Sequence, residues 1–399
     1  MLAPLPIGDE ERSAWLRLAT ARGLKPAALR TLLAAFGLPQ NVLAQPFATL
    51  AAAAGSEAAR AAVAAPTPGF AERLETLNAW CATPGNALVT LADPAYPPRL
   101  LAMPDPPPLL YVQGRLALLH ARSIAVVGSR SATPQAFEDA ARFARAFAAA
   151  GATVVSGLAL GVDGAAHRGA LDERGGTAAV VGTGADLVYP RTHRALAAQI
   201  AQRGAILSEW PLGTPARSAN FPQRNRLIAA LVEGVVIVEA AMRSGSLITA
   251  RLANEMGRDV FALPGSIHAP LARGCHRLIK EGAQLVESPE EVLEALGIQL
   301  SAAPAASTAH SDGESVAQPA RAARHEPPRQ SGHARSPGNP DPEALRVLDA
   351  LGHAPATLEI LAARTELSEA ALQAALLQLE LSGQLNSLPG GWFVRATLR

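Results

Sequence analysis

Basic side chains surround one aromatic ring in the segment RSANFPQRNRLIAAL. Three arginines accompany Phe221 there: Arg217, Arg224 and Arg226. No acidic residue occurs between residues 212 and 232. Guanidinium groups pair with phosphates while a ring face stacks on a base, which is the combination that single-stranded nucleic acid needs. A second interpretation makes Phe221 a hydrophobic staple before a helix, and under either one we expect the arginines to be exposed.

Three turns rich in glycine and serine follow apolar runs and precede helical patterns. They are Gly128-Ser129-Arg130, the loop that begins with Ser156-Gly157, and Ser244-Gly245-Ser246. Such turns present backbone N–H groups and a helix N-terminus to a ligand, an arrangement that binds phosphates. We therefore expect anion-binding turns. A dinucleotide site is disfavoured because G-x-G-x-x-G is absent, and a Walker A loop is excluded because neither lysine follows a glycine.

Three titratable residues near these turns could support catalysis, but each has a structural interpretation that we prefer. Asp163 is expected to be a helix N-cap rather than a catalytic acid. His167 is expected to form structural hydrogen bonds. Glu239, at the end of GVVIVEA, is expected to be an ionised carboxylate paired with neighbouring arginines.

The elements that must position these residues are short apolar strands that alternate with helices between residues 123 and 297. The strand candidates are SIAVV, ATVVS, TAAVV, AILSE, GVVIVEA, DVFALP and AQLVE. Strands this uniformly apolar are buried on both faces, and intervening helices form parallel crossovers. The pattern predicts an α/β fold with a Rossmann-like, doubly wound, mostly parallel sheet. Ligands in such sheets bind beyond the carboxyl ends of the strands, which is where the three turns occur.

The rest of the chain divides into smaller parts around this predicted core at residues 121–300. Residues 1–65 suggest a small helical domain of the helix-hairpin-helix or SAM type, although Gly23 and Gly37 could equally be simple helix ends. Residues 66–120 are rich in proline, which predicts an extended connecting segment. Residues 301–340 hold no aromatic residue, which predicts a flexible, disordered linker.

A winged helix is predicted at residues 341–399, from three short helices followed by a hairpin. The first helix starts at Pro342, while Thr357 and Ser368 cap the second and third. The whole segment holds seven acidic and four basic side chains, and the recognition helix from Glu369 to Leu381 has no basic residue. That helix is poorly matched to a phosphate-lined groove, so we expect the domain to contact protein, or the chain's own core, rather than DNA.

Composition limits the remaining function classes. The formal net charge is only +1, so any nucleic-acid site must be a local cluster of basic residues. The mean hydropathy of +0.14 shows that the chain can bury a substantial core. Cys81 and Cys275 are the only cysteines, too few for a disulfide framework or a zinc site. The sequence shows no membrane-spanning segment and no N-terminal signal with a basic start and an apolar run. We therefore expect a cytoplasmic protein with no membrane contact, metal or cofactor.

The motifs GSR, SGLALGVDGAAHRGAL, FPQRNRLIAAL and RSGSLITA, in this order and spacing, resemble the core of the DprA/Smf DNA-processing family. The resemblance implies a homodimeric, single-stranded-DNA-binding protein that protects incoming DNA and assists loading of the RecA recombinase in natural transformation. It also implies a non-enzymatic DNA-binding site. Its residues would be Gly128, Ser129, Arg130, Ser156, Gly157, Arg217, Asn220, Phe221, Arg224, Asn225, Arg226, Ser244, Gly245 and Ser246.

An enzymatic alternative is a nucleotide phosphoribohydrolase of the lysine-decarboxylase-like (LOG) type, whose core the sequence also resembles. Those enzymes carry PGGxGTxxE before a helix. The corresponding turn here is MRSGSLIT, which places Thr249 where the hydrolase glutamate would stand. Because that chemistry needs a carboxylate, we prefer the binding function.

Overall fold

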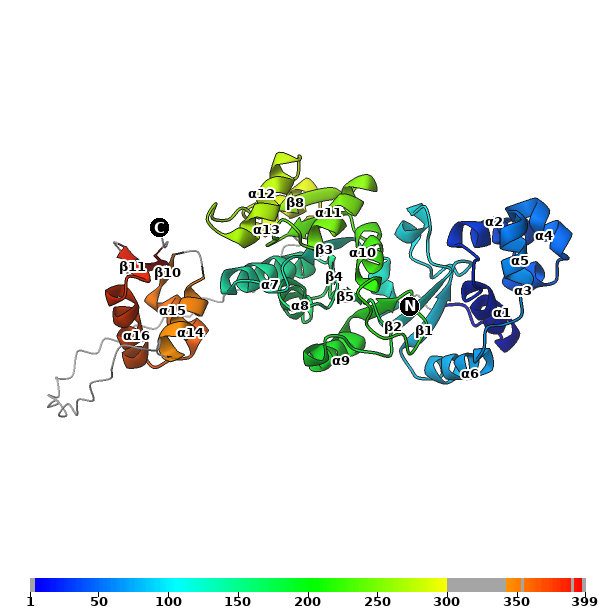
Figure 1. Cartoon of the computed structure of the whole chain (residues 1–399), viewed down its shortest axis with the longest axis horizontal. Coiled ribbons are helices and arrows are strands. Elements are labelled where there is room, and N and C mark those ends of the chain that lie inside the picture. Colours follow the sequence, from blue (N-terminus) through cyan, green and yellow to red (C-terminus); the bar gives the residue numbers. More distant parts are fainter. Residues whose placement is uncertain (1–3, 300–341, 353–354, 389–390, 397–399) are drawn as a thin grey trace, which may run out of the picture. The chain divides into compact units, whose positions relative to one another are not determined.

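The computed structural model describes residues 4–299, 342–352, 355–388 and 391–396 (Figure 1). They form two compact units, an N-terminal one up to residue 299 and a C-terminal one that begins at residue 342. The predicted linker at residues 301–340 lies outside the described residues. Within the described ranges, no helix is long and apolar enough to cross a membrane.

A nine-stranded sheet organises the N-terminal unit, with the strand order β1-β2-β6-β5-β4-β3-β7-β8-β9. Every pair of adjacent strands from β6 to β9 in this order is parallel, which confirms the predicted α/β class with a mostly parallel sheet. The parallel strands are β3 (Ser123–Val127), β4 (Thr153–Ser156), β5 (Thr177–Val180), β6 (Ala205–Ser208), β7 (Gly234–Ile237), β8 (Asp259–Ala262) and β9 (Gln284–Leu285).

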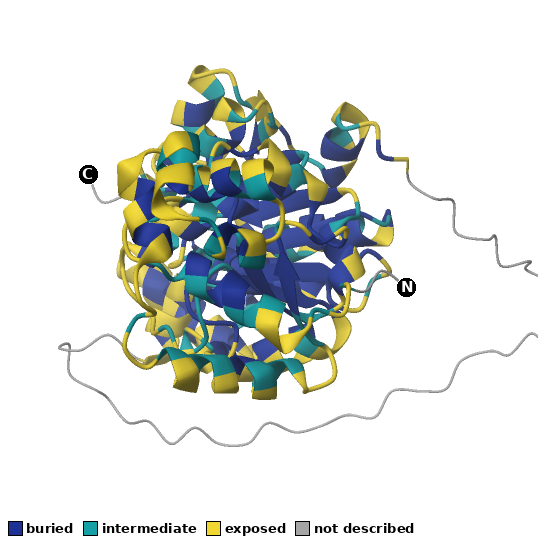
Figure 2. Ribbon diagram, turned by 90° about the vertical axis from the view of Figure 1, so that its right-hand side faces the viewer, coloured by how far each residue is buried: buried dark blue, intermediate teal, exposed yellow. Residues whose placement is uncertain are grey.

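Helices cover both faces of this sheet, which explains why the strand sequences are apolar at every position. In β3, Ile124 and Val126 pack with helices α7, α8 and α13, whereas Ala125 and Val127 pack with α10, α11 and α12. Figure 2 shows the buried strands enclosed by helices whose outer sides are exposed. The helices are α7 (Pro134–Ala149), α8 (Val162–Ala170), α9 (Arg194–Arg203), α10 (Asn220–Leu231), α11 (Ser246–Glu255), α12 (Arg273–Lys280) and α13 (Pro289–Ala295).

The proline-rich segment predicted as an extended connection instead contributes regular structure to the sheet. It contains α6 (Phe70–Cys81), β1 (Asn86–Thr90) and β2 (Leu109–Gly114). These two strands pair antiparallel with each other, and β2 pairs antiparallel with β6. The prolines between residues 94 and 108 all lie in the connection between the strands, so they remove no hydrogen bond from the sheet.

Five short helices precede α6: α1 (Asp9–Ala19), α2 (Pro26–Phe36), α3 (Pro39–Leu43), α4 (Phe47–Ala54) and α5 (Ser56–Val63). They enclose a small apolar core of their own, which includes Leu18, Leu32 and Leu50. The α2 helix ends at Gly37, whose φ of 80° suits glycine and whose N–H donates to the carbonyl of Leu33 (2.8 Å). The interpretation of Gly37 as a helix end is therefore confirmed.

The C-terminal unit is a winged helix, as predicted. Its helices are α14 (Pro342–Leu351), α15 (Leu358–Thr365) and α16 (Glu369–Leu381), and its strands are β10 (Ala356–Thr357), β11 (Leu385–Leu388) and β12 (Trp392–Arg395). The strands form a three-stranded sheet in the order β10-β12-β11. Thr357 and Ser368 cap α15 and α16, because their hydroxyls accept from the N–H groups of Ile360 and Ala371.

Candidate nucleic-acid interface

A cavity of about 710 Å³ opens at the carboxyl ends of the parallel strands, and we call it the strand-end pocket. Its walls come from the turns after β3, β4, β5 and β7, together with the segment before α10 and the first turns of α10 itself. Most of the residues predicted for the site line it: Gly128, Ser129, Arg130, Phe221, Arg224, Asn225, Ser244, Gly245 and Ser246. The fold thus brings together three segments that are spread between residues 128 and 246 of the sequence.

An aromatic and cationic cluster forms one wall of the strand-end pocket. The guanidinium of Arg130 lies over the Phe221 ring, and the ring of Tyr189 lies 5.5 Å from that of Phe221 at an angle of 40°. Arg130 is exposed and Tyr189 is 48% exposed, so solvent reaches both groups. Sequence reasoning missed Tyr189. The available signal was its position after β5, at the same sheet edge as the other turns.

Arg224 lines the pocket but is only 4% exposed, so the expectation that it would be exposed is wrong. Its Nη1 donates to the carbonyls of Gly157 (2.6 Å) and Val180, which lie after β4 and at the end of β5. Burial lowers the pKa of Arg224 to about 10, against the opposing effect of nearby Asp163. Gly157 belongs to the same contact, because a Cβ atom there would overlap the guanidinium. Arg224 and Gly157 therefore have a structural role in the wall of the pocket.

Arg226 lies outside the lining of the strand-end pocket, and the expectation of exposure is wrong for it as well. Its side chain is 13% exposed and forms ion pairs with Glu209 and Asp105 (3.5 Å). Burial raises the pKa of Glu209 to about 7, while the Arg226 charge opposes this rise. The absence of acidic residues from 212 to 232 favoured an exposed arginine, but both acidic partners of Arg226 lie outside that stretch.

The other predicted site residues that do not line the pocket have different positions. The Asn220 side-chain amide donates to the carbonyl of Gly182 (2.9 Å), and Ser156 Oγ donates to the carbonyl of Val126 (2.7 Å). Both side chains are buried and stabilise the sheet edge. Arg217 is exposed, and its neighbours Ala216 and Ser218 line the pocket in its place.

Carboxylates of the chain itself already occupy two of the three predicted anion-binding turns. Glu239 accepts from the N–H (3.1 Å) and hydroxyl (2.8 Å) of Thr133 at the start of α7, rather than from an arginine as expected. Asp163 accepts from the N–H groups of Gly157 (3.1 Å) and Ala159 (3.3 Å). It is the second residue of α8 rather than the expected N-cap, which is Gly161.

The third turn, before α11, has hydroxyl groups where the other two have carboxylates. Ser244 Oγ and Ser246 Oγ lie 2.7 Å apart, and the Ser246 N–H donates to Ser244 Oγ (3.3 Å). Among the described contacts, no carboxylate pairs with this turn or with the exposed guanidinium of neighbouring Arg243, which also lines the pocket. A helix N-terminus with hydroxyls and a nearby cation remains suited to an external phosphate.

His167 is a buried structural group, as expected. Its Nε2 accepts from the N–H of Leu158 (3.3 Å), and its Nδ1 lies 2.7 Å from the Thr177 hydroxyl. Burial lowers the pKa of His167 to about 3, and the charges of His193 and Arg224 lower it further. The imidazole is therefore neutral at ordinary pH and positions the loop after β4.

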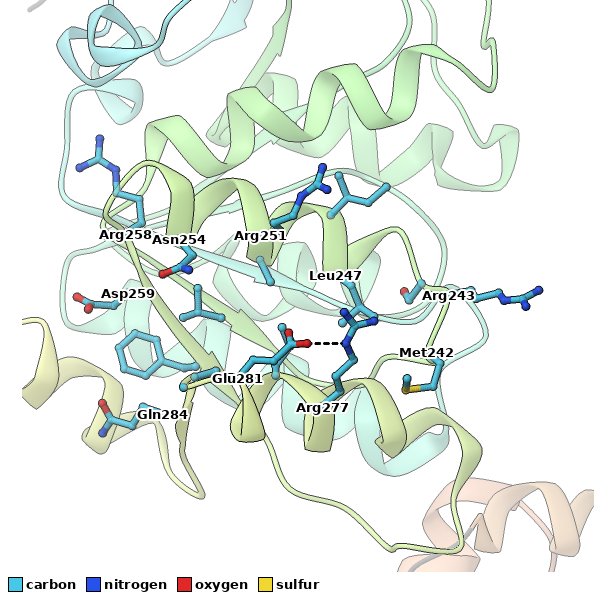
Figure 3. A pocket seen from close by; sticks show the side chains of 18 residues that line it. Met242, Arg243, Leu247, Arg251, Asn254, Arg258, Asp259, Arg277, Glu281 and Gln284 are labelled. Atoms are coloured by element: carbon cyan, nitrogen blue, oxygen red, sulfur yellow. Dashed lines mark hydrogen bonds and ion pairs between the residues drawn. The ribbon is translucent and has the colours of Figure 1, made fainter.

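A second cavity, of about 610 Å³, lies between α11, β8 and α12 (Figure 3). It shares Arg243, Ser244 and Ile248 with the strand-end pocket. An ion pair between Arg277 and Glu281 (2.7 Å) crosses its wall, and Arg243 extends away from that pair. No pattern in the sequence indicates this cavity, because its walls are ordinary faces of helices and of strand β8.

Comparisons with known proteins agree with this fold. Residues 87–297 match the family described as DNA recombination-mediator protein A, and residues 331–391 match the DprA winged helix domain. The chain is 40% identical to protein Smf of Escherichia coli over 323 residues, which cover 80% of each protein. It is 46% identical to the DNA processing protein DprA of Streptococcus pneumoniae over 204 residues, which cover 51% of this chain and 72% of that protein.

A solved structure gives the same result. The X-ray structure of DprA from Streptococcus pneumoniae is similar to this chain with a TM-score of 0.59 and 35% sequence identity. The similarity covers 73% of this chain and 98% of the pneumococcal one. The resemblance predicted from the motifs is confirmed, and the chain belongs to the DNA recombination-mediator protein A family, which includes the proteins named DprA and Smf.

Proposed function

We propose that the strand-end pocket binds single-stranded DNA, and that the chain holds this DNA for a RecA recombinase during DNA uptake in natural transformation. The observation that carries the proposal is the stack of Arg130 on Phe221 beside the start of α11, where no carboxylate of the described residues pairs with the turn. This arrangement provides a cation, a ring and a helix N-terminus within one cavity. Membership of a recombination-mediator family supports the same function.

The chemistry of the pocket favours single strands over duplex. Phosphates would meet Arg130, Arg243 and the serine hydroxyls before α11, while a base would contact Phe221 or Tyr189. A ring can stack on a base only when a face of that base is exposed. Single strands can expose base faces, whereas in a duplex the neighbouring base pairs cover them. The near-neutral charge of the whole chain means that this local cluster, rather than the overall surface, supplies the attraction.

We further propose that the pocket binds and does not catalyse. Thr249, at the position of the hydrolase glutamate, is buried and lines the pocket. The carboxylate that does line it, Asp163, accepts hydrogen bonds from two amides and is only 6% exposed. The test is incubation with nucleoside monophosphates and with ATP. Release of base or phosphate that Asp163→Asn abolishes would replace the binding function with the hydrolase alternative.

Titration of the full chain with fluorescent oligonucleotides tests DNA binding directly. We expect tighter binding to a single strand than to a duplex of the same length at each of several salt concentrations. Equal affinities would contradict the preference for single strands, and affinities unchanged in an Arg130→Ala/Phe221→Ala variant would show that DNA binds elsewhere. A parallel measurement of RecA filament formation on the same single strand, with and without this chain, tests the mediator role separately.

A further inference from the structure

Helix α16 of the winged helix is apolar on two opposite sides. Four of its residues face the domain core and are buried: Leu372, Ala375, Leu376 and Leu379. At 100° per residue, a second set lies on the opposite side of the helix: Ala370, Ala374, Leu377 and Leu381. We call this second set the α16 stripe. Leu377 is 57% exposed and Leu381 is 80% exposed, so the described residues of the winged helix leave the stripe uncovered.

An uncovered stripe of this kind is unusual for a helix in water. A helix on the surface of a domain needs only one apolar face, which packs on the core, and its opposite face normally carries polar residues. Exposed contiguous apolar side chains therefore mark contact surfaces. No side chain of the stripe carries a charge, and α16 contains no basic residue, so a phosphate-lined groove is a poor partner for it.

The order of small and large residues makes the stripe complementary to itself. We propose that the winged helices of two copies of this chain pair through α16, antiparallel, about a two-fold axis between residues 374 and 377. That axis places Ala370 of one copy opposite Leu381 of the other, and Ala374 opposite Leu377. Every apolar pair then joins a small side chain with a large one, which allows close packing of the two helices.

The polar residues beside the stripe agree with the same axis. Gln373 of one copy lies on the same side of the interface as Glu380 of the other, where its amide N–H groups can donate to the carboxylate. Neither acidic residue of the helix meets its own counterpart, because the two copies of Glu380 lie about 14 Å apart along the helix axis and the two copies of Glu369 about 20 Å apart. The axis that pairs the apolar residues therefore also keeps the carboxylates apart.

Size and charge set the strength of this pairing. A helix of 13 residues is about 20 Å long, so two copies bury far less than the roughly 1,600 Å² of a standard interface. The winged-helix segment is also acidic, so two copies repel each other at low salt. We therefore expect weak association that strengthens with added salt, which is the opposite of the salt dependence of DNA binding.

Cysteine cross-linking of the full chain tests the axis. In a Cys81→Ala/Cys275→Ala background, Ala374→Cys places two thiols about 5 Å apart along the helix axis, whereas Ala370→Cys places them about 16 Å apart. A short bismaleimide should therefore join two copies much faster at position 374 than at position 370. Equal or faster cross-linking at position 370, or none at either position at high protein concentration, would overturn the proposal.

Sedimentation equilibrium of the full chain provides a second test. The Leu377→Glu/Leu381→Glu variant should associate at least tenfold more weakly than the native chain. The matched control, Ala363→Glu/Gln384→Glu, adds the same charge at exposed positions off the stripe and should associate like the native chain. Unchanged association of the stripe variant, or a loss of oligonucleotide binding in its place, would assign the stripe to another protein or to DNA. Circular dichroism establishes that both variants are folded.

Discussion

The guanidinium carbon of Arg130 lies 5.4 Å from the centre of the Phe221 ring. Cation–π contact holds the charge on the ring face, so the two side chains form one unit rather than two independent contacts. Removing either one changes the environment of the other. A double-mutant cycle on oligonucleotide affinity should therefore show a coupling of about 0.5–2 kcal/mol between Arg130→Ala and Phe221→Ala, and additive losses would contradict the pairing.

Phe221→Ala is expected to weaken oligonucleotide binding by about 1–3 kcal/mol, because stacking on a base is lost. Since stacking is largely uncharged, the slope of affinity against salt on logarithmic scales should stay nearly the same. The ring also packs against Gly182, so unfolding in urea must be measured alongside. Phe221→Leu is the matched control, because it keeps apolar bulk without a ring. Because Phe221 is the second residue of α10, it is not the staple before a helix, and a loss confined to protein stability would leave the ring with only a packing role.

Arg130→Ala should flatten the logarithmic salt dependence by about 0.7, the value for each phosphate neutralised on a single strand. Arg226→Ala makes a useful contrast, because that side chain is paired with Glu209 inside the protein. It should leave the salt slope unchanged and lower the free energy of unfolding by about 3 kcal/mol. An Arg226→Ala variant that is stable but has a flatter salt slope would return Arg226 to the DNA site.

The penalty for removing Arg226 should also depend on pH. Burial already raises the pKa of Glu209 to about 7, and loss of the arginine removes a charge that lowers it. Below that pKa the carboxyl is neutral and needs no partner, whereas above it an unpaired charge is buried. The Arg226→Ala variant should therefore lose more stability, relative to the native chain, at pH 8 than at pH 6 in urea unfolding. A difference independent of pH would contradict this account.

Gly157→Ala should destabilise the chain by about 3 kcal/mol, because its Cβ would displace a buried guanidinium that donates two hydrogen bonds. Gly245→Ala is the control in the same pocket. Its Cβ would enter open space, and its φ of −63° suits alanine, so the unfolding midpoint should barely change. Similar midpoints for the two variants would mean that Arg224 can move without penalty.

Acid should destabilise the fold through His167. Its pKa is about 3 in the folded chain but ordinary in the unfolded chain, so the unfolded state binds the extra proton between these values. The stability contributed by the neutral imidazole is thus present above about pH 6.5 and falls by up to about 1.4 kcal/mol per pH unit as pH decreases towards 3. His167→Gln should lessen this slope between pH 6.5 and 5 in urea unfolding, whereas exposed His268→Gln should not.

The sequence was sufficient for the parallel sheet and for the location of the pocket, because both follow from local patterns. Apolar runs reveal strands buried on two faces, and glycine and serine turns reveal strand ends. It failed for Arg224 and Arg226, whose partners are carbonyls and carboxylates that only the folded chain brings near. The same limit hid Tyr189, since its nearness to Phe221 depends on how β5 and α10 pack.

The hydrogen bonds of Arg224 have one further consequence for the sheet edge. The backbone hydrogen bonds between parallel strands stop where the strands end, so the loops that follow are ordinarily more mobile than the strands. Here one guanidinium joins the carbonyls of Gly157 and Val180, and so fastens the ends of β4 and β5 to each other and to α10. The conformational entropy of this edge is therefore lost when the chain folds. A ligand therefore binds to a preorganised site, and little further conformational entropy is lost on binding.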